Sequence, residues 1–215
     1  MTAFKSVVLD VDSTISAVEG IDWLAEQRDA AVSEAVLALT SDAMESRVPL
    51  DEVYTRRLSI IKPTRDEIAR LSYIYIATAM PGVRDAIATW QHAGVRVVLV
   101  SGGLRDAIVP LAAWLGVPSE DLHAVDIDYD DGGITVGLHG DAPLARRGGK
   151  PLVVSALNLP TPTLAVGDGA TDAELAATVD RFLAFTGVAR RESVVARAAG
   201  EVESFAALTP IVLGT

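Results

Sequence analysis

The stretch that most constrains the fold is a short apolar run that ends in two carboxylates. Residues Phe4 to Leu9 have the pattern of a β-strand buried on both faces. Asp10 and Asp12 follow at once, and because Asp is a poor strand residue they mark the change from strand to loop. Two carboxylates this close repel each other unless a cation lies between them or one holds a proton. An Asp pair can also be a simple turn or helix cap, so the later segments decide between these interpretations.

Strand and helix patterns alternate along most of the remaining chain. Val95 to Val100 is nearly unbroken aliphatic sequence and predicts a second buried strand. Further strands are expected over residues 122–129, 133–138, 163–166 and 181–185, the first two forming a hairpin. This alternation favours an α/β fold with a Rossmann-like parallel sheet and right-handed crossovers.

A purely helical pattern interrupts this alternation directly after the first strand. Apolar residues recur at helical spacing between residues 17 and 80, and Thr64 to Glu67 matches a capping box after Pro63. We therefore expect a helical cap over residues 15–80, inserted into a core made of residues 1–14 and 81–215. A block in this position would cover the end of the first strand.

Unusual residues gather where the expected strands end or the next helices begin. The segment Gly167 to Asp172 contains two carboxylates one helical turn apart, Asp168 and Asp172. Because parallel strands place their carboxyl ends at one edge of a sheet, these groups are expected to lie near Asp10. Carboxylate oxygens suit Mg²⁺, although an N-cap with a first-turn Asp would also explain the segment.

Two further segments could hold an anion at the same edge. Ser101 and Gly102 end a strand and open a helix, where backbone N–H groups and a hydroxyl can bind phosphate. Lys150 lies in the first turn of an expected helix, where a cation opposes the helix dipole unless an anion is near. Taken singly, an ordinary turn and a solvated lysine are the simpler explanations.

Composition narrows the classes of function. The 215 residues carry 18 basic and 29 acidic side chains, a net charge of −11, which disfavours a nucleic-acid or membrane-surface partner. There is no cysteine, so disulfides and thiolate metal sites are excluded. No signal-peptide pattern or membrane-length apolar run is present, so we expect a cytoplasmic protein. A Gly-x-Gly-x-x-Gly fingerprint and a Walker phosphate loop are both absent.

Four motifs together resemble those of the haloacid-dehalogenase-like phosphatases. They are Asp10-Val-Asp12-Ser13-Thr14, Ser101-Gly-Gly, Gly148-Gly-Lys150 and Gly167-Asp-Gly-Ala-Thr-Asp172. The cap segment Glu19-Gly-Ile-Asp-Trp-Leu-Ala25 extends the resemblance, which covers nearly the whole chain. It implies a haloacid-dehalogenase-like core with an all-helical cap, and Mg²⁺-dependent hydrolysis of a small phosphomonoester, O-phospho-L-serine being the expected substrate.

The resemblance also implies a role for each core residue. Asp10 would attack phosphorus and form an aspartyl-phosphate, while Asp12 would protonate the leaving alkoxide and then activate water. Phosphoryl transfer of this kind needs in-line positioning and nearby cations. The remaining core roles are Mg²⁺ binding by Asp10, the Asp12 main-chain carbonyl and Asp168, phosphoryl binding by Ser101, Gly102 and Lys150, lining of the site by Thr171, and support from Ser13 and Asp172.

Residues of the cap are implied to recognise the rest of the substrate. Glu19 would meet its ammonium group and Arg57 its carboxylate, for which a planar guanidinium is well suited, and Met44 would shape the pocket. The chain departs from the family pattern at Glu45-Ser46, Leu50, Val125 and Thr186-Gly187, although Arg191 still matches. The departures concern substrate contacts and leave the chemistry intact.

Three alternatives stay open at this point. The same chemistry could act on another phosphoamino acid or a sugar phosphate, or it could transfer the phosphoryl group to a second acceptor. A signalling receiver also carries phosphate on an Asp, but it should lack both a lid and an acid/base such as Asp12. The sequence does not distinguish a monomer from a homodimer.

Overall fold

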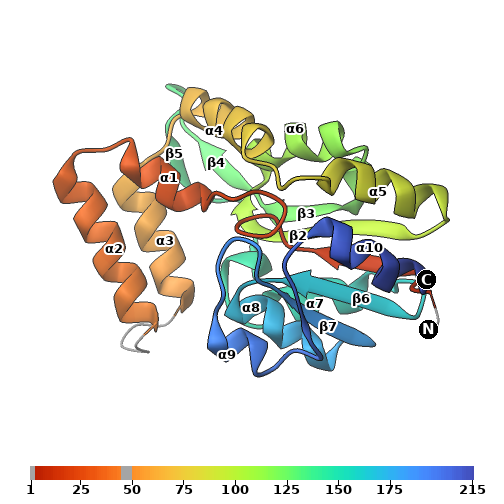
Figure 1. Cartoon of the computed structure of the whole chain (residues 1–215). Helices are drawn as coiled ribbons and strands as arrows, with labels where there is room; N and C mark the ends of the chain where they lie inside the picture. The colour runs from red at the N-terminus through yellow and green to blue at the C-terminus, as the bar shows by residue number, and fades with distance from the viewer. Residues whose placement is uncertain (1–2, 45–49) are drawn as a thin grey trace.

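The central element is a six-stranded parallel sheet in the order β3-β2-β1-β6-β7-β8. We describe residues 3–44 and 50–215 of a computed structural model, except the side chains of residues 37, 40–44, 50 and 51. Figure 1 shows the sheet with helices on both of its faces. The strands are β1 Ser6–Leu9, β2 Arg96–Leu104, β3 Leu122–Val125, β6 Thr163–Gly167, β7 Arg181–Phe185 and β8 Glu201–Val202.

The first strand lies in the middle of the sheet, as its apolar sequence predicts. All four residues of β1 are buried, and it pairs in parallel with β2 on one side and β6 on the other. Alternate residues of β1 face opposite layers: Val7 and Leu9 belong to one apolar cluster and Val8 to another. Burial on both faces explains why the run carries no alternating polar residues.

Helices connect the strands and cover the two faces of the sheet. The first apolar layer includes residues of α5 Val83–His92, α6 Arg105–Leu115 and α10 Phe205–Leu213. The second contains residues of α7 Gly149–Ala156, α8 Ala170–Ala173 and α9 Glu192–Val195. Short 3₁₀ turns complete the connections at Ser119–Asp121, Pro143–Ala145 and Glu174–Ala177.

Four helices follow β1 and precede α5 in the chain, and they lie at one end of the sheet (Figure 1). They are α1 Gly20–Glu26, α2 Ala30–Met44, α3 Leu50–Ile61 and α4 Arg65–Ala77. The capping box that the sequence predicted is confirmed, because Thr64 and Glu67 exchange side-chain and backbone hydrogen bonds at the start of α4. Helix α4 packs against α6, so this part of the helical block is joined to the core.

A small antiparallel hairpin lies beside α3 and α4. It consists of strands β4 Ile127–Tyr129 and β5 Thr135–Leu138. The backbone at the start of α4 is hydrogen-bonded to this hairpin. The Arg65 amide donates to the Gly133 carbonyl at 2.9 Å, and both the amide and the hydroxyl of Thr135 donate to the Pro63 carbonyl, at 2.9 and 2.7 Å.

Two sequence predictions need correction. Residues 122–129 are two strands: 122–125 complete the main sheet, and the chain then turns at Asp126 to form one strand of the hairpin. Strand β2 runs past Val100 to Leu104 with a register shift against β3, so two glycines lie inside it. The helices that follow Asp168 and Arg191 are each about one turn long, and the first continues as the 3₁₀ helix Glu174–Ala177.

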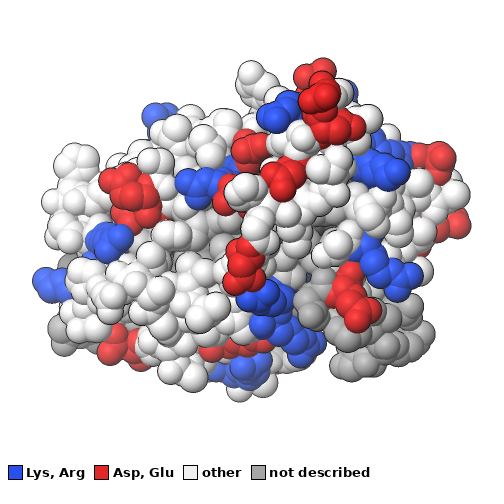
Figure 2. All heavy atoms as spheres, turned by 180° about the vertical axis from the view of Figure 1, so that it is seen from behind, with Lys and Arg blue, Asp and Glu red and all other residues white. Residues whose placement is uncertain are grey.

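Charge is spread over the surface. Figure 2, which shows the face opposite to that of Figure 1, has acidic and basic side chains interspersed among uncharged residues. Among the helices of the described ranges 3–44 and 50–215, none has the length and apolar character needed to cross a membrane.

Candidate active site

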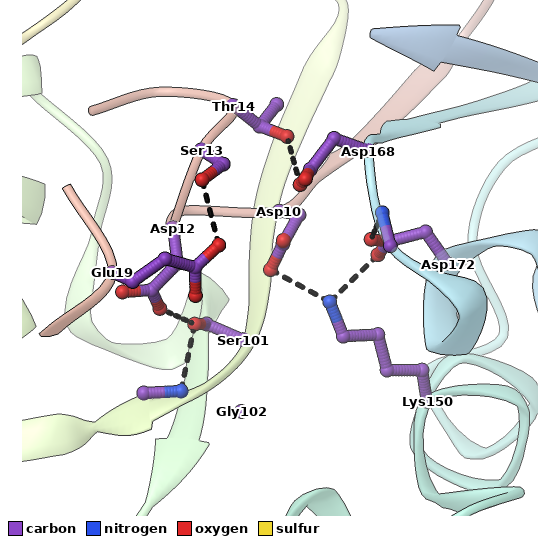
Figure 3. A network of polar contacts seen from close by, with 12 residues as sticks. Asp10, Asp12, Ser13, Thr14, Glu19, Ser101, Gly102, Lys150, Asp168 and Asp172 are labelled. Carbon is purple, nitrogen blue, oxygen red and sulfur yellow. Dashed lines mark hydrogen bonds and ion pairs between the residues drawn. The ribbon is translucent and has the colours of Figure 1, made fainter. Parts of the chain in front are cut away.

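A cavity of about 810 Å³ opens at the carboxyl ends of β1, β2 and β6, beneath the helical block. The segments that bear the predicted site residues meet here although they are far apart in the sequence (Figure 3). Asp10, Asp12, Glu19, Arg57, Gly102, Lys150, Asp168, Thr171 and Asp172 all line this cavity.

The centre of the site is a buried lysine between two carboxylates. The Lys150 ammonium donates to Asp10 Oδ1 and to Asp172 Oδ1, each at 2.6 Å, as Figure 3 shows. Lys150 is 4% exposed and Asp172 is 2% exposed, so water does little to screen these charges. Burial by itself would lower the pKa of Lys150, but the carboxylates of Asp10 and Asp172 raise it, which keeps the lysine charged.

Glycines allow the lysine to reach this position. Gly148 has φ of +73°, a conformation that residues with a side chain adopt only with strain, and it precedes the first turn of α7. A Cβ on Gly149 would lie 1.8 Å from the Pro143 carbonyl oxygen, so the close approach of the two segments excludes a side chain. The two glycines therefore let the backbone approach the segment at Pro143 closely enough for the Lys150 side chain to reach the buried carboxylates.

Asp168 extends the acidic cluster. Thr14 Oγ1 donates to Asp168 Oδ1 at 3.2 Å, and the Arg191 guanidinium pairs with the other oxygen of this carboxylate. Asp10, Asp168 and Asp172 each place one carboxylate oxygen within 4.8 Å of the others. Three buried hard oxygen donors at this spacing suit a divalent cation such as Mg²⁺.

Crowding raises the pKa values of two carboxyl groups. Burial and the Asp10 carboxylate raise the pKa of Asp172 to about 7, and Lys150, which lowers it, offsets only part of this rise. Burial and the carboxylates of Glu19 and Asp10 raise the pKa of Asp12 to about 7 as well. A carboxyl group with a pKa near neutrality can both give and take a proton, which is what an acid/base catalyst requires.

Asp12 is held by donors from several elements. Its Oδ1 accepts from the Gly20 amide and from the Tyr75 hydroxyl, both at 2.7 Å. Its Oδ2 accepts from Ser101 Oγ at 3.2 Å, and Ser101 Oγ also accepts from the Gly103 amide at 2.9 Å. Ser101 therefore connects Asp12 to the segment where the sequence predicts phosphate binding.

The predicted residues of the helical block differ in how closely they reach the cavity. Glu19 lines it, accepts from Ser13 Oγ at 2.6 Å and lies 3.6 Å from Arg191. Arg57 also lines the cavity, and it is paired with Asp22 of α1. Its Nε is buried without a hydrogen-bond partner among the described residues.

Some predicted substrate contacts are not described. The side chains of Met44 and Leu50 lie outside the part of the structure that we describe, as do Glu45 and Ser46 altogether. Val125 is buried at the end of β3 and is not among the residues that line the cavity.

Sequence reasoning missed two tyrosines of the site. Tyr54 of α3 donates to the Gly102 carbonyl at 2.7 Å, and Tyr75 of α4 donates to Asp12. Burial and the nearby Asp12 carboxylate raise the pKa of both phenols, so both remain hydrogen-bond donors at neutral pH. Tyr75 follows Ile68 and Leu71 at helical spacing, so from sequence alone it is indistinguishable from a core residue.

The fold and the site define a class of hydrolase. A parallel α/β sheet, paired aspartates after its central strand and a lysine from a later helix are the features of the haloacid dehalogenase-like hydrolases. The model of this family matches residues 7–177, and the chain belongs to it.

Curated relatives narrow the comparison within this family. The chain is 34% identical to the bovine "Phosphoserine phosphatase" over 206 residues, covering 94% of this chain and 91% of that protein. The human "Phosphoserine phosphatase" is 33% identical over the same shares of the two chains.

Solved structures agree with this fold. A phosphoserine phosphohydrolase-like protein from Francisella tularensis has a TM-score of 0.86 at 23% identity, with 97% of this chain and 100% of that chain covered. A substrate-bound phosphoserine phosphatase complex has a TM-score of 0.77 at 23% identity, covering 95% of each chain. At these identities the structures support the fold alone.

Proposed function

We propose that this protein hydrolyses O-phospho-L-serine to L-serine and phosphate through an aspartyl-phosphate on Asp10. The observation that carries the proposal is the buried Lys150 bridge, because it fixes Asp10 and provides a cation beside the position of the phosphoryl group. Relatives that are named phosphoserine phosphatases, at 33–34% identity over most of the chain, support the choice of substrate.

The first step transfers the phosphoryl group to the enzyme. An Asp10 oxygen attacks phosphorus, the bond from phosphorus to the serine oxygen breaks, and Asp12 gives its proton to the departing alkoxide. Lys150, the Ser101 hydroxyl and the backbone at Gly102 hold the phosphoryl oxygens as negative charge spreads over them.

The second step releases phosphate. Asp12, now a carboxylate, takes a proton from a water molecule that attacks phosphorus, and the bond from phosphorus to Asp10 breaks. Asp10, the Asp12 carbonyl and Asp168 would hold Mg²⁺, with Asp172 supporting them. When bound, this ion would neutralise charge on the phosphoryl group. Ser13 supports the cap side of the site through its hydrogen bond to Glu19.

The cap carries the recognition of the amino acid in this proposal. Residues 15–80 form the cap over a core of residues 1–14 and 81–215. Glu19 meets the ammonium group and Arg57 the carboxylate, while Met44 and Thr171 shape the pocket. A single small-molecule substrate is bound, and the chain acts as a monomer or a homodimer. We also propose that the reaction takes place in the cytoplasm.

The decisive experiment removes the nucleophile. Asp10→Asn should lower kcat for phosphoserine by at least about 1,000-fold, because an amide cannot form the covalent intermediate. Phosphate release by purified folded protein is the measurement, and trapping of the acid-stable phosphoprotein from radiolabelled substrate identifies the intermediate. Turnover retained by this variant would exclude Asp10 as the nucleophile.

Substrate choice and metal use are tested in the same assay. Comparison of kcat/KM over phosphoamino acids and sugar phosphates should favour phosphoserine, and equal values for generic esters would reject the specific assignment. Chelation by EDTA should stop turnover and added Mg²⁺ should restore it, because crowded carboxylates need a cation to bind an anionic substrate.

A further inference from the structure

The hydroxyl of Tyr75 makes a specific contact with the acid/base residue. We call helices α1 to α4 the lid. Tyr75 lies on α4 of this lid and has no exposed surface, yet its hydroxyl is 2.7 Å from Asp12 Oδ1. Burying a phenol hydroxyl is costly unless it has a hydrogen-bond partner, and Asp12 is the partner here. The side chain therefore does more than fill space between the lid and the core.

Gly20 provides the space for this contact. A Cβ on Gly20 would lie 2.1 Å from the Tyr75 hydroxyl oxygen, so a side chain at this position would displace the phenol. The Gly20 amide also donates to the same Asp12 oxygen at 2.7 Å. Two donors from different helices of the lid thus converge on Asp12 Oδ1.

These two donors fix the rotation of the Asp12 carboxyl group. Oδ1 accepts two short hydrogen bonds, and any rotation short of a half-turn, which only exchanges the two equivalent oxygens, would leave both buried donors without a partner. Oδ2 lies on the side of Ser101, where the phosphoryl group is expected, and would be only 2.8 Å from a Cβ at position 103. Oδ2 is therefore the oxygen that is presented to the substrate.

We propose that Tyr75 is a positioning residue for proton transfer, which together with Gly20 holds the Asp12 carboxyl group so that Oδ2 faces the leaving oxygen of the substrate. This inference rests on the proposed function, in which Asp12 protonates the departing alkoxide. Tyr75 acts through Asp12 and makes no contact with the reacting atoms.

The leaving group of the substrate provides a selective test. An alkoxide such as that of serine needs a proton as it departs, whereas 4-nitrophenolate departs as a stable anion. Tyr75→Phe should lower kcat/KM for phosphoserine about 10-fold or more, because the variant loses one hydrogen bond to a charged group. For 4-nitrophenyl phosphate it should fall by less than about twofold, because that reaction gains little from general acid catalysis.

Three further variants make the result interpretable. Tyr129→Phe removes the same kind of bond, a phenol to the Asp106 carboxylate at 2.8 Å, away from the cavity, and should change neither substrate. Asp12→Asn should lower kcat/KM for phosphoserine much more than kcat/KM for 4-nitrophenyl phosphate. If both values fall equally, the proposed role of Asp12 fails rather than that of Tyr75. Gly20→Ala keeps the phenol but displaces it, and should reproduce the effect of Tyr75→Phe.

The outcomes separate positioning from a structural role. Selective loss with phosphoserine in Tyr75→Phe supports the proposal. Equal loss with both substrates, or no loss with either, overturns it. If thermal unfolding shows that Tyr75→Phe does not fold, Gly20→Ala decides by the same two criteria.

Discussion

Two clusters of charged side chains in this protein, one buried and one partly buried, are built in opposite ways. At the sheet edge, Lys150 is shared by Asp10 and Asp172, and burial with carboxylate repulsion raises the pKa of Asp172 to about 7. In the lid, Arg28 meets a single carboxylate, and its hydrogen bonds lower the pKa of Glu67 to about 2. At the sheet edge one lysine faces two carboxylates, so negative charge is in excess. In the lid one arginine faces one carboxylate, so the two charges balance.

The difference teaches which cluster serves binding and which serves stability. Glu67 also completes the capping box of α4, and Arg28 donates to the Ile61 carbonyl, so the lid pair joins three helices. The carboxylates at the sheet edge are not fully compensated by their own partners, and the cluster gains stability when a further proton or cation binds to them. Raised carboxyl pKa values therefore mark the site, and a lowered one marks the scaffold.

The largest effect should come from breaking the cluster at the sheet edge. Lys150→Met leaves Asp10 and Asp172 buried without their cation, and loss of one partner from a buried ion pair costs about 3–5 kcal/mol. We expect this loss in urea unfolding at pH 7, together with phosphatase activity at least about 1,000-fold lower. Lys5→Met, at an exposed lysine, is the matched control and should change neither quantity. A Lys150→Met protein of normal stability would show that the cluster is not as crowded as its geometry indicates.

A smaller effect should follow in the lid. Arg28→Met should lower the free energy of unfolding by about 2 kcal/mol, the value of hydrogen bonds to a charged group. Because the folded-state pKa of Glu67 lies below its unfolded value of 4.5, this stabilisation is present above pH 4.5 and is lost as pH falls toward 2. The difference between wild type and variant in urea unfolding should shrink over that range.

An exposed arginine on the same carboxylate serves as the control for the lid pair. Arg70 lies 3.9 Å from Glu67 with a largely exposed side chain, and Arg70→Met should cost less than about 0.5 kcal/mol. Equal losses for Arg28→Met and Arg70→Met would contradict a special role of the Arg28 pair.

The smallest effect, of opposite sign, should come from relieving the crowding. Asp172→Asn imitates the protonated carboxyl group and should stabilise the protein by about 1 kcal/mol at pH 8 in EDTA, while lowering activity. The folded-state pKa of Asp172 is raised, so wild-type stability falls as pH rises from 3.8 through 7, and the variant should lose this slope. Thermal unfolding across this pH range measures it, and a variant as pH-dependent as wild type would refute the assignment.

The sheet and its catalytic edge could be predicted because both follow from local patterns. Buried parallel strands are continuous apolar runs, and the polar residues that follow these runs at Asp10, Ser101 and Asp168 must meet at one edge. Lys150 was predicted to join them from its place in a first helical turn, which needs an anion. The structure brings Asp10, Lys150 and Asp168 together in one cavity, and Ser101 is joined to this site through its hydrogen bond to Asp12.

Contacts between distant segments could not be predicted in this way. The capping box of Thr64 and Glu67 was recognisable because it is local, but Arg28 reaches Glu67 across 39 positions and leaves no pattern. Tyr75 follows the helical stripe of a core residue, so its hydroxyl contact with Asp12 is invisible in sequence. The break at Asp126 was missed because both strands that it separates have strand-forming residues.

The bonds between the hairpin and the linker before α4 restrict how substrate can enter. Pro63 and Arg65 are tied to β5 and its turn, and α4 packs on α6, so an opening motion must leave α4 attached to the core. Displacement of α1 and α3 away from α4 would also have to break the Arg28 hydrogen bonds to Glu67. Asp12, the proposed acid/base, would therefore keep its hydrogen bond to Tyr75 while substrate and product exchange.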